Sequence, residues 1–350
     1  MSEKLSPIYQ EPTAVGDAYR QAYADGITRF IAQRNAACKE LRRAQFSPAE
    51  VVQNAEEYRT RLKKMLGMEL FANTEYSVTK KYVGKDSLCE IWRLTVTVMD
   101  CIPFYALLMI PHERRASTPL VIAQHGGGGT PELCSDFYGK NNYNGMVRRA
   151  LSRGCTVLAP QLLLWAQAES ETQRAHAIPY SRRDIDRDLK RFGASVTALE
   201  ISCIQRTLDY LLEEEGFDES RVGMMGISYG GYFTLHTMAV DTRIRSGYCA
   251  AVFNDRDRFC FSDWSYTGSA NTFQDAEVAA LCAPRHLFVQ VGKTDSVFDY
   301  QSAVEEARRV PDYFEALGAS DRFRFSVWDG GHTISDDDTG LDFFLSPLFD

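Results

Sequence analysis

The hydrophobic positions change their period along the chain. Over residues 17–68 they recur at helical spacing, which predicts helices. A start signal stands at Ser47-Pro48-Ala49-Glu50, because serine caps a helix, proline suits its first position and Glu50 completes a capping box. Behind it the apolar face is Val51, Ala55, Tyr58, Leu62 and Met65, and the other faces carry Glu56, Glu57, Arg59 and Lys63. We expect residues 1–75 to form an N-terminal helical extension that packs on the core or makes an oligomer contact.

The pattern then shortens to the alternation of strands. Residues 92–98 alternate between apolar and polar side chains, and residues 104–110 return after a turn, which predicts an antiparallel pair. Near-continuous apolar runs follow, separated by helical patterns, at residues 119–124, 155–159, 222–226, 247–253, 286–291 and 323–328. Runs that are apolar on both faces are typical of parallel strands covered by helices on both sides. The predicted fold class is α/β, with a doubly wound, mostly parallel sheet in a domain of residues 76–350.

Composition supports a globular protein with small partners. The chain has 350 residues, of which 45% are hydrophobic and 25% charged, enough for a sizeable core. A net charge of -8 argues against nucleic acid or an anionic membrane as the main partner. The nine cysteines are odd in number and include no C-x-x-C pair, and no apolar stretch approaches the roughly 18 residues of a membrane span. We expect a cytoplasmic protein, and a homo-oligomer is compatible with these features.

One short motif carries a specific chemistry. Gly226-Ile227-Ser228-Tyr229-Gly230 matches G-x-S-x-G, and it lies between an apolar run and the helical stretch of residues 232–240. In such a strand–turn–helix the sharp turn exposes the serine hydroxyl, and the flanking glycines let the strand and the helix approach closely. Ser228 is therefore the predicted nucleophile.

A serine nucleophile needs a base, which a third group orients. In sites built on this turn the chain order is serine, then acid, then histidine. His236 lies in the helix after the turn and His286 opens an apolar run, so both suit structural roles better. His332 follows the last run in Asp329-Gly330-Gly331-His332-Thr333, at the carboxyl end of a strand where catalytic groups collect. His332 is the predicted general base.

The acid should leave the strand that precedes the histidine strand. Asp295 follows residues 286–291 directly and is the predicted partner of His332, whose tautomer it would hold. Asp299 is the fallback, and the run Asp336-Asp337-Asp338 suits a charge cluster or a helix cap.

An oxyanion hole should complete the set. It would combine the Tyr229 backbone N–H with one from His125-Gly126-Gly127-Gly128-Gly129, where we single out Gly126 and Gly127. A phosphate loop is excluded because Thr130-Pro131-Glu132 replaces the Lys-Ser/Thr that such a loop requires. No metal and no cofactor are expected.

These motifs resemble the α/β-hydrolase superfamily, in particular its dienelactone hydrolase and acetyl xylan esterase-like branches with an N-terminal extension. The resemblance covers the chain from about Tyr76 onward. Dienelactone hydrolases proper use a cysteine nucleophile, whereas this chain has Ser228. Gly226 to Gly231 is also similar to the turn of the prolyl oligopeptidase group, but about 115 N-terminal residues are too few for that group's β-propeller.

A long connection follows the strand at residues 155–159. Residues 160–195 are predicted to form a lid-like insertion, since loops of this length inside a domain are usually functional. Candidate substrate-binding residues are His125, Trp165, Arg182 and Arg183. The arginines suit a substrate carboxylate. The acids interspersed among them favour a solvated, self-paired face instead.

The resemblance implies hydrolysis of a carboxylic ester through an acyl-enzyme, with a short acyl group on a carbohydrate or small metabolite. Two alternatives stay open: a peptidase of the prolyl oligopeptidase type, and a non-catalytic binding protein on the same scaffold. Fold does not give substrate, so the alcohol and the acyl length are not read from the sequence.

Overall fold

The computed structural model describes residues 8–114, 117–164 and 181–350. Its strands form one sheet in the order β1-β2-β3-β5-β4-β6-β7-β8-β9. The strands are β1 (Tyr76–Lys85), β2 (Cys89–Val98), β3 (Ile102–Pro111), β4 (Leu120–Gln124), β5 (Thr156–Pro160), β6 (Val222–Ile227), β7 (Ser246–Ala250), β8 (His286–Gly292) and β9 (Phe323–Trp328). Pairing is antiparallel from β1 through β3 to β5 and parallel from β5 onward. The predicted α/β class and the mostly parallel sheet are confirmed.

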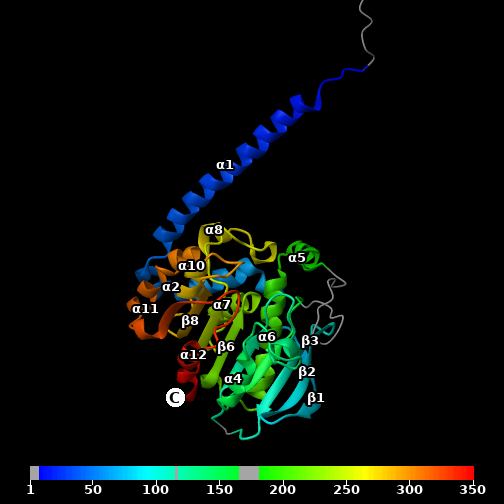
Figure 1. Ribbon diagram of the computed structural model, residues 1–350, viewed down its shortest axis with the longest axis vertical. Coiled ribbons are helices and arrows are strands. Elements are labelled where there is room, and N and C mark those ends of the chain that lie inside the picture. The colour runs from blue at the N-terminus through cyan, green and yellow to red at the C-terminus, as the bar shows by residue number, and fades with distance from the viewer. Residues whose placement is uncertain (1–7, 115–116, 165–180) are drawn as a thin grey trace, which may run out of the picture.

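Helices cover both faces of this sheet (Figure 1). The α-helices are α1 (Thr13–Gln45), α2 (Pro48–Leu66), α3 (Pro131–Cys134), α4 (Met146–Ser152), α5 (Arg182–Lys190), α6 (Val196–Glu213), α7 (Tyr229–Val240), α8 (Ser269–Thr272), α9 (Asp275–Ala280), α10 (Tyr300–Ala307), α11 (Val310–Ala316) and α12 (Thr339–Phe349). Short 3-10 helices are η1 (Met68–Phe71), η2 (Glu219–Arg221), η3 (Ser262–Trp264) and η4 (Ser320–Arg322). One buried cluster joins the sheet to α2, α6, α7 and α9, and a second joins its other face to α4 and α12.

Strand β1 was not predicted from the sequence. Its residues alternate between exposed and half-buried, and Lys80, Lys81 and Lys85 make it more polar than the runs that form the other strands. It lies at the edge of the sheet beside β2, where one row of backbone groups faces outward. An edge strand needs little apolar surface, so its sequence carries a weak hydrophobic signal.

The N-terminal residues form two helices. Ser47 caps α2 by accepting the Glu50 N–H at 3.3 Å, whereas the Glu50 carboxylate bonds Asn54, so half of the predicted capping box forms. Val51 and Leu62 are buried as predicted. Arg59, predicted to lie on an outer face, is instead 5% exposed, because its guanidinium donates to the carbonyl oxygens of Ala239 and Leu281.

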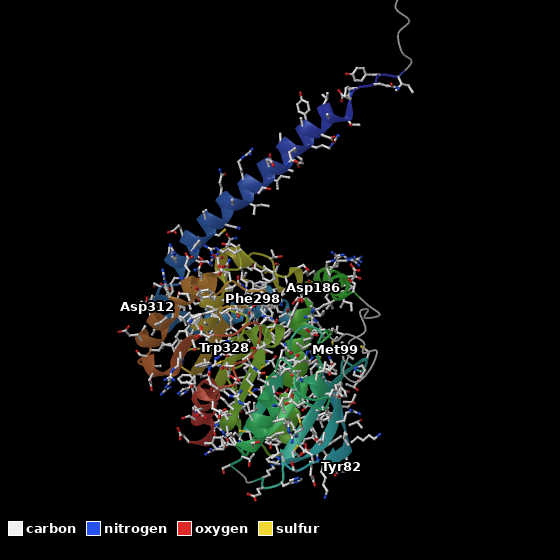
Figure 2. The ribbon with its side chains drawn as sticks, viewed as in Figure 1. Tyr82, Met99, Asp186, Phe298, Asp312 and Trp328 are labelled. Carbon is white, nitrogen blue, oxygen red and sulfur yellow. The ribbon has the colours of Figure 1, made fainter. Side chains whose placement is uncertain are left out.

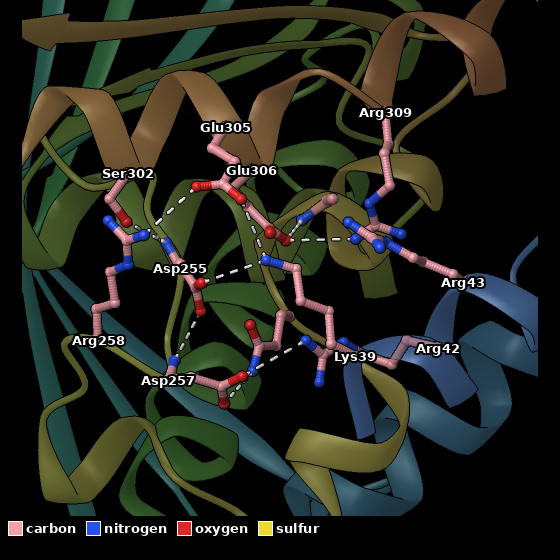
Figure 3. Close-up of polar contacts among 12 residues, drawn as sticks. Lys39, Arg42, Arg43, Asp255, Asp257, Arg258, Ser302, Glu305, Glu306 and Arg309 are labelled. Atoms are coloured by element: carbon pink, nitrogen blue, oxygen red, sulfur yellow. Dashed lines mark hydrogen bonds and ion pairs between the residues drawn. The ribbon is translucent and has the colours of Figure 1, made fainter. Parts of the chain in front are cut away.

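The last turns of α1 attach to the core through charges (Figure 3). Lys39 lies 3.4 Å from Glu305, and Arg42 lies 3.8 Å from Asp257 and 3.7 Å from Glu277. We call the following set the anchor cluster: Lys39, Arg42, Asp255, Asp257, Glu277, Glu305, Glu306 and Arg309. The rest of α1 extends away from the sheet and its covering helices (Figure 1). Within the described residues, no helix combines the length and the apolar character needed to span a membrane.

Candidate active site

Ser228 occupies a strained turn between β6 and α7. Its backbone has φ 58° and ψ -121°, a conformation that costs energy for a residue with a side chain. Both neighbouring glycines are required, since a Cβ on Gly226 would overlap the Gly230 backbone and one on Gly230 would overlap the Gln124 carbonyl. The close fit of β4, β6 and α7 therefore forces the serine into this turn, and its side chain is half-exposed while Ile227 and Tyr229 are buried.

Asp295 and His332 meet at the same edge of the sheet. The His332 Nδ1 lies 2.9 Å and 3.1 Å from the two carboxylate oxygens of Asp295. A carboxylate only accepts, so Nδ1 carries the proton and the neutral ring leaves Nε2 as an acceptor. The loops that carry Asp295 and His332 approach closely because residue 292 is a glycine. A Cβ on Gly292 would overlap the carbonyl oxygens of Gly330 and Gly331.

The environment keeps Asp295 ionised. Burial alone would raise the pKa of its carboxyl group, but hydrogen bonds from His332 and from the backbone N–H groups of Phe298 and Val297 outweigh burial and lower the pKa. The Asp295 side chain is 1% exposed and that of His332 is 22% exposed. The Phe298 ring, labelled in Figure 2, lies 5.7 Å from the His332 ring and shields one side of it. The pair thus combines a buried anion with an imidazole that water can reach.

Ser228 comes from the same edge but is not bonded to His332. Strands β6, β8 and β9 run parallel, so their carboxyl ends, which carry Ser228, Asp295 and His332, lie on one side of the sheet. Among the described residues, the Ser228 hydroxyl makes no hydrogen bond. Catalytic hydrogen bonds are often long in the absence of substrate and shorten when it binds.

The fallback acids have other partners. Asp299 caps α10 by accepting the Gln301 N–H at 3.1 Å. Asp338 pairs with Arg149 at 2.8 Å and with Arg153 at 2.7 Å, and Asp337 accepts the Thr339 N–H at the start of α12. Of the acids considered, Asp295 is the one that contacts His332.

The two candidate oxyanion-hole donors of the glycine loop, the N–H groups of Gly126 and Gly127, differ in their hydrogen bonding. The Gly126 N–H is buried and donates to the Tyr143 hydroxyl at 3.0 Å, so it is already used. The Gly128 N–H donates to the Leu164 carbonyl oxygen at 2.5 Å, and the Gly129 N–H donates to the Gly126 carbonyl oxygen at 3.1 Å. Within the described residues the N–H of Gly127 has no partner, and this exposed residue packs on the Tyr229 ring. Gly127 and not Gly126 is thus free to bond a ligand.

His125 was predicted to bind substrate, but its ring is buried and bonds to the backbone. It is 0% exposed, so it cannot touch a substrate without a rearrangement. Its Nε2 accepts the Leu162 N–H at 3.0 Å, so Nδ1 carries the proton and donates to the Gly126 carbonyl at 2.8 Å. The ring fastens the glycine loop to the start of the 160–195 connection.

The predicted arginines differ from each other. Arg182 is buried and forms a bidentate pair with Glu200 at 2.8 and 3.0 Å, and its Nε lies 2.6 Å from Asp263. Asp263 also accepts the Tyr229 hydroxyl at 3.0 Å. Arg182 thus supports the residue after Ser228, and its charge is compensated, so neither a solvated face nor a free carboxylate receptor describes it. Arg183 is exposed, and Trp165 lies outside the described residues.

Asp263 and Glu200 were missed by sequence reasoning. Both side chains are at most 5% exposed, although charged residues are rarely buried without a partner. A hint was present in their settings, since Glu200 lies in an apolar helix and Asp263 stands between Phe261 and Trp264. What no local pattern gives is their meeting with Arg182 across distant segments.

Comparison with known proteins gives one family match. Residues 202–310 match the model of the prolyl oligopeptidase family, Peptidase_S9. No curated protein sequence matches the chain.

Similar solved structures include three esterases. A candidate acetyl xylan esterase from Bacteroides fragilis is 15% identical, with a TM-score of 0.62 over 81% of this chain and 76% of that one. The methylesterase BT1017 is 18% identical, with a TM-score of 0.64 over 85% of this chain and 64% of that one. A glucuronoyl esterase from Solibacter usitatus is 14% identical, with a TM-score of 0.57 over 79% of this chain and 86% of that one. At such identities the likeness establishes the fold. The sheet order, the strained serine turn and these similarities together show that the chain has the α/β-hydrolase fold.

Proposed function

We propose that this chain is a serine hydrolase that cleaves a carboxylic ester, with Ser228 as nucleophile, His332 as general base and Asp295 as the acid that orients the histidine. One observation carries the proposal: a strained serine turn and a bonded aspartate–histidine pair occupy carboxyl ends of strands in one parallel sheet. Residues 76–350 would form the catalytic domain with residues 160–195 as its insertion, and residues 1–75 the extension.

The geometry suggests a two-stage reaction. The Ser228 Oγ attacks the acyl carbon while His332 Nε2 takes its proton, and Asp295 stabilises the imidazolium. The tetrahedral intermediate then collapses, and His332 protonates the departing alcohol. Water attacks the acyl-serine in the same way, with His332 taking its proton and returning it to Ser228. No metal or cofactor enters either step.

The developing oxyanion needs two donors. The Tyr229 N–H begins α7, where the helix leaves its first N–H groups without intrahelical partners, and Gly127 lies against the Tyr229 ring. We assign the N–H groups of Tyr229 and Gly127 to the oxyanion hole. Loss of one such donor costs about 10²–10³-fold in rate.

For the substrate we propose an ester with a short acyl group, on a carbohydrate or small metabolite. The name of the acetyl xylan esterase supports the short acyl group on a carbohydrate. The names of the methylesterase and the glucuronoyl esterase support ester hydrolysis without favouring a short acyl group. The cytoplasmic location, the homo-oligomer and the exclusion of nucleic acid and membrane partners stay predictions of the sequence.

A fluorophosphonate probe and an ester series test the proposal together. The probe should label the wild type and not Ser228→Ala, and kcat/KM for nitrophenyl esters should fall from acetate to palmitate. Labelling of Ser228→Ala equal to that of the wild type would overturn the nucleophile. Faster cleavage of palmitate would overturn the short acyl group while leaving the nucleophile in place.

A peptidase is the second candidate, because the matched family model is that of prolyl oligopeptidases. A short peptide nitroanilide in the same assay separates the two functions. If kcat/KM for the anilide exceeds that for the acetate ester, the peptidase replaces the esterase as the proposed function.

A further inference from the structure

An arginine stands directly before each of the last four parallel strands. Strands β6, β7, β8 and β9 are preceded by Arg221, Arg245, Arg285 and Arg322. These strands are neighbours in the sheet, and their first residues are close to one register, since Ser246 pairs with His286 and Leu287 with Phe323. Neighbouring strands lie about 4.8 Å apart, so the four arginines form a row along the amino edge of the sheet.

A cavity lies against three arginines of this row. Arg245, Arg285 and Arg322 line it together with Arg59 of α2, and its volume is about 530 Å³. Cavities of roughly 300–1,000 Å³ are typical of sites for small molecules. The cavity therefore has the size of a ligand site, and its charged lining is dominated by guanidinium groups.

Two of the four guanidinium groups have a carboxylate partner. Arg59 is bonded to Glu56, which also lines the cavity. Arg245 lies 3.8 Å from Glu219, and both side chains are exposed. The charges of these two arginines are thus matched within the protein.

Arg285 and Arg322 have no such partner. Within the described residues neither guanidinium forms an ion pair, and both donate to backbone carbonyl oxygens instead. The acceptors are Asp241, Ile244 and Leu281 for Arg285, at 2.9–3.0 Å, and Pro284 for Arg322, at 3.2 Å. Burial lowers the pKa of the Arg285 guanidinium to about 10, and the charges of Arg59 and Arg245 act in the same direction. Carbonyl groups fix the position of an arginine but carry no net charge, so two positive charges remain uncompensated.

The other titratable groups nearby do not change this balance. His286 lines the cavity, but burial and the Arg322 charge lower its pKa, so it is neutral at pH 7. Asp321 and Asp350 act on His286 from outside the cavity lining. The charge that the cavity lacks is therefore about two negative units.

We propose that this cavity binds a small molecule through a phosphate monoester group, held by Arg245, Arg285 and Arg322. A phosphate monoester carries about -1.5 to -2 charges at pH 7, which matches the two uncompensated guanidinium groups. A single carboxylate would balance only one of them. Guanidinium groups also fit phosphate geometrically, because their N–H groups bond two oxygens at once.

The rest of the cavity suits a compact organic group. One phosphate group does not fill the volume, so the remainder is left for the part of the ligand that carries the phosphate. The uncharged residues of the lining are Ala55, Ser220, Thr242, Ala283, Pro284, Leu317 and Pro347. Most of them are apolar, so we expect a small and partly apolar group.

The cavity is remote from the candidate active site. Strand β8 has seven residues, and each residue of a strand advances by about 3.3 Å, so the arginine row lies about 20 Å from the carboxyl edge that carries Asp295. The bound molecule is therefore a second ligand and not the ester that is cleaved. This binding stands independently of the proposed function.

Calorimetric titration of the full chain with phenyl phosphate tests the site. In buffer without phosphate or sulfate, the wild type should bind one molecule per chain. Arg245→Met and Arg322→Met should each raise Kd about 10-fold or more, because each removes charged hydrogen bonds to the phosphate. Both side chains are exposed, so both variants should keep their fold, which circular dichroism checks. A wild type that shows no saturable binding, or an unchanged Kd in both variants, would overturn the proposal.

Arg221→Met is the matched control. Arg221 has the same position before β6, but it pairs with Asp218 at 3.3 Å, donates to the Leu348 carbonyl oxygen at 2.9 Å and does not line the cavity. Its replacement should leave Kd nearly unchanged. Equal weakening by Arg221→Met and Arg245→Met would show a general effect of surface charge and contradict a defined site.

Two further probes identify the group that is recognised. Benzoate keeps the ring of phenyl phosphate but carries one charge, so it should bind more weakly. Benzoate binding as tightly as phenyl phosphate would contradict the recognition of a dianion. Inorganic phosphate lacks the ring and should also bind more weakly, and equal affinity would assign the cavity to free phosphate in place of a monoester.

Discussion

The sheet edge that carries Ser228 and the anchor cluster both contain buried carboxylates, but the two environments shift the pKa of a carboxyl group in opposite directions. At the edge one carboxylate, Asp295, meets one imidazole, and its pKa is lowered because hydrogen bonds outweigh burial. In the anchor cluster five carboxylates meet three cations, and burial together with the Glu277 charge raises the pKa of Glu306 to about 7. The more perturbed carboxyl group is therefore structural. A perturbed pKa marks burial and crowding, and it indicates catalysis only where geometry agrees.

The largest expected effect is a loss of kcat when the residues at the edge that carries Ser228 are changed. Ser228→Ala and His332→Ala should each reduce kcat by about 10⁶-fold without unfolding the protein, because nucleophile and base act as one unit. His286→Ala is the matched control, since this half-buried histidine lies at the opposite end of β8. Steady-state ester hydrolysis and circular dichroism are the measurements. Full activity in His332→Ala would remove the edge from the mechanism.

The next largest effect on kcat is expected when the Asp295 carboxylate is replaced by an amide. Asp295→Asn should reduce kcat by about 10⁴-fold, because the amide favours the wrong histidine tautomer. Asp299→Asn, four residues further along, changes a helix cap and should leave kcat within a few-fold of wild type. The acid is misassigned if the two variants exchange these results.

A substitution of Arg182 tests whether this buried, paired charge stabilises the fold as the buried charges of the anchor cluster do. Arg182→Met leaves Glu200 and Asp263 buried without their cation, which should lower the free energy of unfolding by about 3–5 kcal/mol. Arg187→Met on the same helix removes exposed pairs and should leave the free energy of unfolding nearly unchanged. Urea denaturation measures both, and equal losses would contradict the buried network.

The smallest expected effect concerns stability against pH. Glu306 has a raised pKa in the folded chain, so its contribution to stability is complete below the unfolded pKa near 4.5 and is lost as the pH rises through about 7. The groups that face it are Glu277, Asp275 and Arg309 and the Ala276 N–H. Glu306→Gln should remove this decline, on the order of 2–3 kcal/mol, and leave ester hydrolysis unchanged. Parallel stability curves for wild type and variant from pH 4 to 8 would show that Glu306 is not the responsible group.

Sequence reasoning succeeded where the information is local. The apolar runs predicted strands β4 to β9, and the alternation over residues 92–98 predicted the pair of β2 and β3, which is confirmed. The contact between Asp295 and His332 followed from chain order and strand ends. The polar edge strand β1 was missed because its outer row is exposed.

Other features depend on contacts between distant segments. The distinction between Gly126 and Gly127 rests on the Tyr143 hydroxyl, which no spacing rule links to the glycine loop. The burial of Arg182 depends on Glu200 and Asp263, which approach it from α6 and η3. Meetings of this kind are decided by the packed fold, so a single sequence does not reveal them.

The edge strand β1 has a consequence for behaviour at high concentration. Open strand edges recruit other chains, which is a route to fibrils and precipitates. The exposed positions of β1 include Lys81 and Lys85 as well as Tyr82 and Val83, and the register shift between Tyr82 and Gly84 breaks the regular ladder of backbone groups. A second strand that added there would have to bury ammonium groups and match an irregular edge. This border of the sheet is thus protected against aggregation by the same polarity that hides it in the sequence.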